Sequence, residues 1–126
     1  MINAPGSQEE RLAICRLLIA ERTLVGAHFG FDATPSPTWD VLLDLYLAHQ
    51  EGRTIYLWSL CVAANIPMSS AHRKITELVD KGWLCRSADQ GDGRRVTVGL
   101  TPPTLDRLDL LLDAFRDRCA KHLTLE

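Results

Sequence analysis

The chain has 126 residues, 46% of them hydrophobic, and a formal net charge of −2. This length allows one domain with a real core and is too short for two. An acidic total argues against a general polyanion-binding protein, and Gly and Pro are too few for a disordered or fibrous chain.

The N-terminal segment begins with a helix-capping sequence. Ser7 can cap a helix, and Glu10, three residues later, can reach back to complete a capping box. We therefore expect a helix over residues 7–25, with Leu12, Cys15 and Ile19 on one of several apolar faces. A surface helix of a small monomer normally has a single apolar stripe, so this helix is expected to be buried on two sides.

Residues 26–37 are rich in Gly and Pro, which is typical of a loop. Ser36 and Pro37 then favour the start of a second helix, as a cap followed by a proline at the first helical position. This helix is expected to reach about Gln50. Its predicted buried face consists of Val41, Leu42, Leu45 and Tyr46, with Trp39 near its start.

The centre of the chain predicts two helices separated by a tight turn. A short strand at 54–56 precedes a helix at 57–64, and a second helix is expected at 67–81, ended by Gly82. Cys61 and Ala71 are small enough to let these helices approach, and Asn65 can supply the bend. The second helix has one apolar face, made of Ala71, Ile75, Leu78 and Val79.

The opposite face of that helix carries Ser69, Ser70, His72, Arg73, Thr76 and Glu77. A helix fits the major groove of DNA with its N-terminal residues against base edges. Arg73 can bond guanine bidentately, and the two serines can reach phosphates. Basic charge is also concentrated here, since residues 69–101 hold six Lys/Arg against four acids, while both flanking stretches are net acidic. An ordinary solvated helix face is the simpler alternative.

The C-terminal third predicts a hairpin followed by a helix. Strands are expected at 83–87 and 96–100 around a Gly-containing turn at 89–93. Thr101, Pro102 and Pro103 are expected to cap and open the last helix. Its apolar residues step by three and four, as in a coiled-coil seam: Leu105, Leu108, Leu112, Phe115, Cys119 and Leu123.

Residues 54–103 resemble the MarR family of bacterial winged-helix regulators. The resemblance lies in Leu60, Cys61 and Ile66 around the turn, in residues 68–73, in the Leu-Val-Asp-Lys-Gly-Trp-Leu run at 78–84, and in 92–102 with its Asp-x-Arg and Leu-Thr-Pro. It implies a mainly α fold with a small β-hairpin. In that reading one domain spans 1–126, with a winged helix-turn-helix at 36–101 between dimerisation helices at 7–25 and 102–124.

The resemblance implies a homodimeric, sequence-specific DNA-binding transcriptional regulator, most simply a repressor. Its DNA-binding residues here would be Ser69, Ser70, His72, Arg73, Lys74, Thr76, Arg94 and Arg95. Arg94 would enter the minor groove from the wing, supported by Asp92. The expected dimer interface consists of Leu12, Cys15, Ile19, Leu105, Leu108, Leu112, Phe115 and Cys119.

Many members of the family bind a small effector between the dimer helices and the DNA-binding lobe. His28, Phe29, Phe31 and Trp39 would line such a cleft here, although aromatic packing under a loop is the simpler interpretation. A winged helix used for protein association without DNA binding remains the alternative function, favoured by the acidic total charge and by Glu77 on the groove face.

Other classes of function find no support in the sequence. The sequence has no nucleophile–base pair, no Gly-rich phosphate loop and no paired carboxylates in a plausible pocket, so we expect neither an enzyme nor a cofactor. No apolar run approaches the roughly 18 residues that cross a bilayer, and no secretory signal is evident, which predicts a cytoplasmic protein without membrane contact. The four cysteines are expected to be small buried residues that bind no metal.

Overall fold

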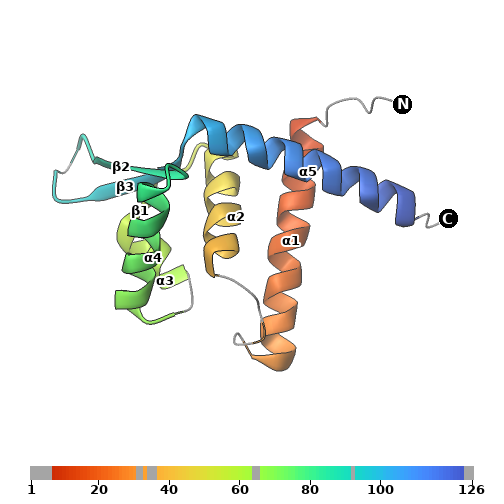
Figure 1. Ribbon diagram of the computed structural model, residues 1–126, viewed down its shortest axis with the longest axis horizontal. Coiled ribbons are helices and arrows are strands. Elements are labelled where there is room, and N and C mark those ends of the chain that lie inside the picture. Colours follow the sequence, from red (N-terminus) through yellow and green to blue (C-terminus); the bar gives the residue numbers. More distant parts are fainter. Residues whose placement is uncertain (1–6, 31–32, 34–36, 64–65, 92, 124–126) are drawn as a thin grey trace.

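A computed structural model describes residues 7–30, 33, 37–63, 66–91 and 93–123. Five helices and three short strands follow the chain in this order: α1 (Gln8–Phe29), α2 (Pro37–Gln50), β1 (Ile55–Tyr56), α3 (Leu57–Ala63), α4 (Met68–Asp80), β2 (Leu84–Ala88), β3 (Val96–Leu100) and α5 (Pro102–His122). In Figure 1, α5 lies across α2 and α1, while α3, α4 and the β2–β3 hairpin form the opposite end of the molecule.

Helix α1 starts at the predicted cap. The Ser7 hydroxyl accepts from the Glu10 amide at 3.1 Å, and the Glu10 carboxylate accepts from the Ser7 amide at 3.0 Å, which completes the capping box. The helix runs to Phe29, so the loop predicted from residue 26 begins too early. Gly26 is buried inside the helix, and Gly30, with φ +88°, ends it.

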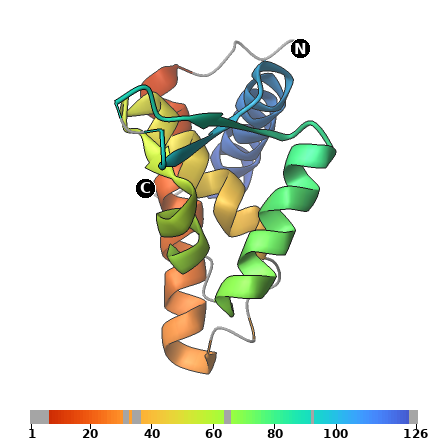
Figure 2. The same cartoon turned by 90° about the vertical axis from the view of Figure 1, so that its left-hand side faces the viewer.

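The predicted hairpin pairs with a third strand. β2 and β3 are antiparallel, with Leu84 opposite Leu100, and β1 adds to the other side of β3 through Ile55 opposite Val98. Val98 and Leu100 point into the core, as the alternation in the sequence predicts. Figure 2 shows the sheet crossing one end of the helices.

Helices α3 and α4 pack through small residues. Cys61 and Ala71 are each 1% exposed, as expected for small residues where two helices approach. Ile75 and Leu78 continue the buried face of α4. Gly82, with φ +78°, ends α4 in a conformation that favours glycine. The predicted bend at Asn65 and the predicted cap at Ser36 lie outside the described residues.

The seam of α5 is used within the chain. Leu108 and Leu112 are buried at 4% and 0% exposure, and Cys15 of α1 is also at 0%. These three residues belong to the hydrophobic core together with Leu43, Leu45 and Tyr46 of α2. Because helices of the same chain already cover them, these three side chains have little surface left for the predicted contact with a second copy.

Thr101 occupies the predicted N-cap position of α5, but its side chain does not cap the helix. Its hydroxyl instead donates to the Gly82 carbonyl at 2.8 Å, and its amide donates to the Trp83 carbonyl at 3.1 Å. Thr101 therefore fastens the start of α5 to the turn that ends α4.

The cysteines fall into two groups. Cys15 and Cys61 are buried, as predicted, whereas Cys85 is exposed on β2 and Cys119 is half-buried. The expectation of four buried cysteines is thus wrong for Cys85, because β2 is buried at Leu84 and exposed at its other four residues. Among the described residues, no helix has the length and apolar character needed to cross a membrane.

Candidate nucleic-acid interface

The exposed face of α4 carries the residues predicted to meet DNA. Ser69, His72 and Arg73 are exposed and Ser70 is half-buried, on the side opposite the buried Ala71 and its neighbours. Pro67 precedes the helix and has no side chain that could cap it. Within the described residues no side-chain cap is made at Pro67, and such a helix start suits an external acceptor such as a phosphate.

Two residues of this face are engaged within α4. The Lys74 ammonium lies 3.1 Å from the Glu77 carboxylate, which offsets its charge. The Thr76 hydroxyl donates to the His72 carbonyl at 3.0 Å, so it retains only its acceptor capacity. The structure therefore separates Arg73, which is exposed, from Lys74, which is already paired.

The wing carries the other predicted contacts. Arg94 and Arg95 lie directly before β3, where the hairpin turn ends, and both are exposed. The Arg95 guanidinium stacks over the Tyr56 ring at 5.0 Å from its centre. Asp92, the predicted support of Arg94, lies outside the described residues.

Asp89 is a wing-supporting residue that the sequence reasoning missed. Its carboxylate accepts from the Gly91 amide at 3.2 Å and from the Tyr56 hydroxyl at 3.3 Å. Its amide also donates to the Arg95 carbonyl at 2.9 Å, closing the hairpin. The Asp-x-Gly sequence is typical of such a turn and could have identified Asp89, but the link to Tyr56 depends on the pairing of β1 with β3.

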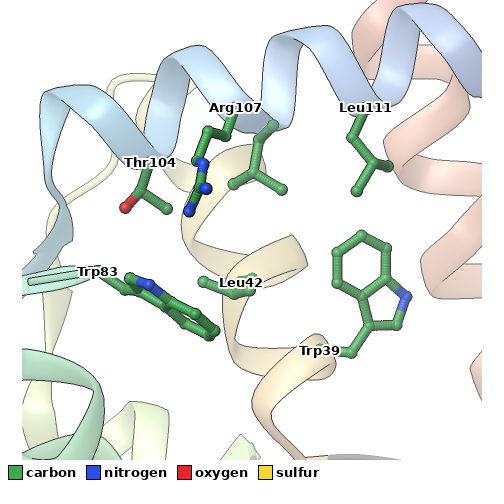
Figure 3. Close-up of a pocket in the computed structure, with 7 residues that line it drawn as sticks. Trp39, Leu42, Trp83, Thr104, Arg107 and Leu111 are labelled. Atoms are coloured by element: carbon green, nitrogen blue, oxygen red, sulfur yellow. The ribbon is translucent and has the colours of Figure 1, made fainter. Parts of the chain in front are cut away.

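An apolar cavity of about 250 Å³ lies between α2, α5 and the residue that precedes β2. Figure 3 shows Trp39 and Leu42 of α2 facing Thr104, Arg107 and Leu111 of α5, with Trp83 closing one end. Arg107 is the charged residue among those that line it: Trp39, Leu42, Trp83, Thr104, Arg107, Leu108 and Leu111. The cavity therefore combines two indoles with a guanidinium.

Only part of the predicted effector cleft lies at this cavity. Trp39 lines it, but His28 and Phe29 are exposed on the last turn of α1, and Phe29 is 80% exposed. Because α1 continues past residue 26, it carries both side chains away from the residues that line this cavity. Phe31 lies outside the described residues.

A short chain of contacts joins the cavity to the end of α4. The Thr104 hydroxyl lies 2.9 Å from the Thr101 hydroxyl, which in turn donates to the Gly82 carbonyl. Trp83, the next residue, lines the cavity and lies under Lys81, whose ammonium is 5.2 Å from the ring centre. Two neighbouring contacts therefore link the cavity to the turn that follows α4.

Large apolar side chains remain exposed on α1 and α5. They include Leu17 at 62%, Leu24 at 59%, Leu110 at 70%, Leu111 at 42% and Phe115 at 41%. Of these, Phe115 was predicted at the dimer interface, and four other residues predicted there are half-buried: Leu12, Ile19, Leu105 and Cys119. Isolated domains rarely expose this much apolar side chain on neighbouring helices without a partner.

No protein-family model and no curated protein matches the sequence. Solved structures do match its fold. A MarR family transcriptional regulator from Silicibacter pomeroyi is 21% identical and superposes with a TM-score of 0.57, over 98% of this chain and 84% of that one. FabT from Streptococcus pneumoniae, in complex with DNA, is 12% identical, with a TM-score of 0.54 over 88% of this chain and 75% of that one.

MepR from S. aureus, bound to ethidium bromide, is 13% identical and has a TM-score of 0.56, over 96% of this chain and 85% of that one. These identities are low, and the likeness is one of fold. The chain therefore has the winged-helix fold of MarR-family regulator structures, with helices at both ends, as the sequence resemblance predicts.

Proposed function

We propose that this chain is a sequence-specific, duplex-DNA-binding transcriptional regulator of the cytoplasm that works as a homodimer. The observation that carries the proposal is the exposed start of α4, with Ser69, His72 and Arg73 on its surface, in a winged-helix fold. A helix presented in this way enters the major groove with its N-terminal residues against base edges. The fold similarity to FabT, whose structure contains DNA, supports the same proposal.

The proposed dimer uses the apolar side chains that the chain leaves exposed. Leu17 and Leu24 are seven residues apart and share one face of α1, and Leu110 and Phe115 lie on α5. The C-terminal half of α5 extends past α1 in Figure 1, where a second copy can pack against it. A symmetric dimer would place its two α4 helices about 34–36 Å apart, or a multiple of this, and would recognise a pseudo-palindrome.

The proposed DNA contacts divide by their role. Arg73 would read a base edge, Ser69 and Ser70 would bind phosphate, and Arg94 would reach the minor groove. Occupying an operator in this way would repress transcription by steric occlusion. The role is that of a binding protein rather than an enzyme.

Arg73→Ala and Lys74→Ala make a matched pair for the test. Each would be titrated onto a duplex enriched from a random pool and onto a scrambled duplex, at two salt concentrations. Arg73→Ala should weaken the enriched duplex by about 1–3 kcal/mol and the scrambled one much less. Lys74→Ala should cost less, because Glu77 already pairs with that ammonium. Equal losses on both duplexes, or wild-type binding that is insensitive to salt, would contradict the proposal.

Protein association without DNA binding is the competing function. The observation that favours it is Glu77, which places an acid on the α4 face and holds Lys74. It predicts that the wild-type protein retains no duplex at low salt while retaining a protein partner. The same titration therefore separates the two functions.

We also propose that the cavity beneath α5 binds a small effector. Two indoles and several leucines suit a flat apolar molecule, and Arg107 suits a carboxylate on its edge. The structure of MepR bound to ethidium bromide supports a small-molecule site in a similar fold. In this chain, the Arg107 guanidinium favours a negatively charged ligand.

A pair of probes tests the effector site. 1-Naphthoate should raise the melting temperature and lower DNA affinity, whereas 1-naphthalenemethanol, which has the same shape but no charge, should do so much less. Arg107→Met should remove the difference between the two compounds. Equal shifts by both compounds in the wild-type protein would show that Arg107 does not select an anion.

A further inference from the structure

A polar cluster joins α1, α2 and α5 at one place. The Tyr46 hydroxyl of α2 donates to Asp109 of α5 at 2.5 Å and accepts from the side-chain amide (Nε2) of Gln8 in α1 at 3.5 Å. Arg11 of α1 donates from Nε and Nη2 to the two carboxylate oxygens of Asp113, each at 2.9 Å, and its Nη1 lies 3.7 Å from Asp109. Three helices that are distant in sequence are thus held by one network.

Tyr46 is the buried centre of this network. Tyr46 is 0% exposed and belongs to the hydrophobic core. Burial raises the pKa of the Tyr46 phenol, and the hydrogen bond to Asp109 raises it further, so the hydroxyl remains a donor near neutral pH. A directional hydrogen bond of this kind fixes orientation in a way that apolar packing does not.

The cluster lies where two parts of the molecule meet. α2 packs against both α1 and β3, while α5 packs against α1. We call α1 and α5 the arm, and residues 37–100 the lobe. Leu42, one turn before Tyr46, and Leu108, next to Asp109, both line the cavity described above, so the network stands beside it.

We propose that the Tyr46–Asp109 hydrogen bond is the pivot that fixes the angle between lobe and arm, and with it the separation of the two α4 helices in the dimer. The proposal rests on the dimeric DNA-binding function proposed above. Tyr46 is a positioning residue, since it touches no DNA and acts through the orientation of the lobe. Half-site spacing on the operator would then depend on one buried hydroxyl.

Tyr46→Phe tests the pivot because it keeps the ring and removes the hydroxyl. A spin label on the exposed Cys85 of the wing, in a Cys119→Ser background, gives one wing-to-wing distance in the dimer without DNA. We expect a narrow distance distribution with Tyr46 and a clearly broader one with Tyr46→Phe. Arg16→Gln is the control, because it breaks a surface contact of α1 with Glu51 and leaves α5 untouched.

A second measurement uses the enriched duplex and a version with one base pair inserted between its half-sites. Tyr46→Phe should reduce the ratio of the affinities for the two duplexes roughly tenfold. A change of this size corresponds to the loss of one hydrogen bond to a charged group. Asp109→Asn, which keeps an acceptor for Tyr46, should reduce that ratio less. A merely structural role would lower the melting temperature of both variants and leave this discrimination unchanged.

The outcomes separate the pivot from the function on which it rests. Unchanged distances in a folded, dimeric Tyr46→Phe protein would overturn the pivot, even where wild-type protein binds DNA well. Absence of any wing-to-wing distance in the wild-type protein would overturn it too, together with the dimer. A dimer that shows the expected broadening but binds no duplex would support the pivot and refute the DNA-binding function.

Discussion

Arg73 and Lys74 are adjacent cations with different surroundings. Lys74 is held by Glu77, whereas Arg73 projects from the exposed side of α4. The sequence predicted both as DNA-binding residues from their positions near the start of the helix. It could not rank them, since the Lys74–Glu77 contact depends on which side-chain conformation each residue adopts.

Asp89 shows a second limit of sequence reasoning at this scale. The sequence directed attention to Asp92 as the wing support, through its spacing from Arg94. Asp89 accepts from Tyr56, which lies 33 residues earlier in the chain and beside it only because β1 joins the sheet. Local spacing can suggest a turn residue, but it cannot reveal a partner from another strand.

The cysteines provide a prediction at the residue scale. Burial raises the pKa of Cys15 to about 11 and also raises that of Cys61, whereas Cys85 is exposed. Because the thiolate is the reactive form, a disulfide reagent should modify Cys85 first and reach the two buried thiols only after unfolding. Peptide mass analysis with and without denaturant measures this order. Equally fast modification of Cys15 would show that the core packing described here is wrong.

At the scale of elements, the sequence predicted each helix and strand and erred at boundaries and partners. The end of α1 was placed too early because Gly26 suggests a loop, yet Gly26 is buried inside the helix, where a single glycine is tolerated. The α5 seam was recognised, but periodicity shows only that a face is covered. It cannot show whether α1 and α2 of the same chain or a second copy covers it.

Leu112 and Leu110 test that distinction. Leu112 is 0% exposed and Leu110 is 70% exposed on the same helix. Leu112→Ala should lower the free energy of unfolding by about 2–5 kcal/mol, because it leaves a cavity in the core. Leu110→Ala should leave the fold intact and weaken the dimer, as measured by sedimentation. A dimer-specific effect of Leu112→Ala with no loss of stability would reverse this assignment.

The capping box of α1 gives a prediction that depends on pH. Ser7 lowers the pKa of Glu10 below its ordinary value of 4.5, because first its backbone amide and then its side-chain hydroxyl donate hydrogen bonds to the Glu10 carboxylate. A carboxyl whose pKa is depressed in the folded state adds stability above its unfolded pKa, and this is lost as pH falls through the folded value.

Glu10→Gln should therefore lower the free energy of unfolding near neutral pH, because a neutral side-chain amide accepts the hydrogen bond from the Ser7 amide less strongly than a carboxylate does. The difference between wild type and variant should shrink at a pH well below 4.5, as the folded pKa of Glu10 is passed. Denaturant unfolding at the two pH values measures it. A difference that stays constant with pH would mean that Glu10 takes no part in the cap.

At the scale of the molecule, one arrangement relates the parts to each other. The lobe presents α4 and the wing, the arm leaves apolar residues exposed, and the Tyr46 network and the cavity lie between lobe and arm. Fold class and element order could be predicted from the sequence because they follow from periodicity and turn residues. The cavity and the network could not, since the cavity is built from α2, α5 and Trp83 and the network from three helices, all brought together only by folding.

The central claim is that two copies present their α4 helices to one face of DNA. Sequencing the duplexes that the wild-type protein selects from a random pool tests it most directly. We expect an enriched pseudo-palindrome whose half-sites are centred about 10–10.5 base pairs apart, or a multiple of that spacing. A selected pool with no enriched sequence, or with single half-sites only, would contradict the account.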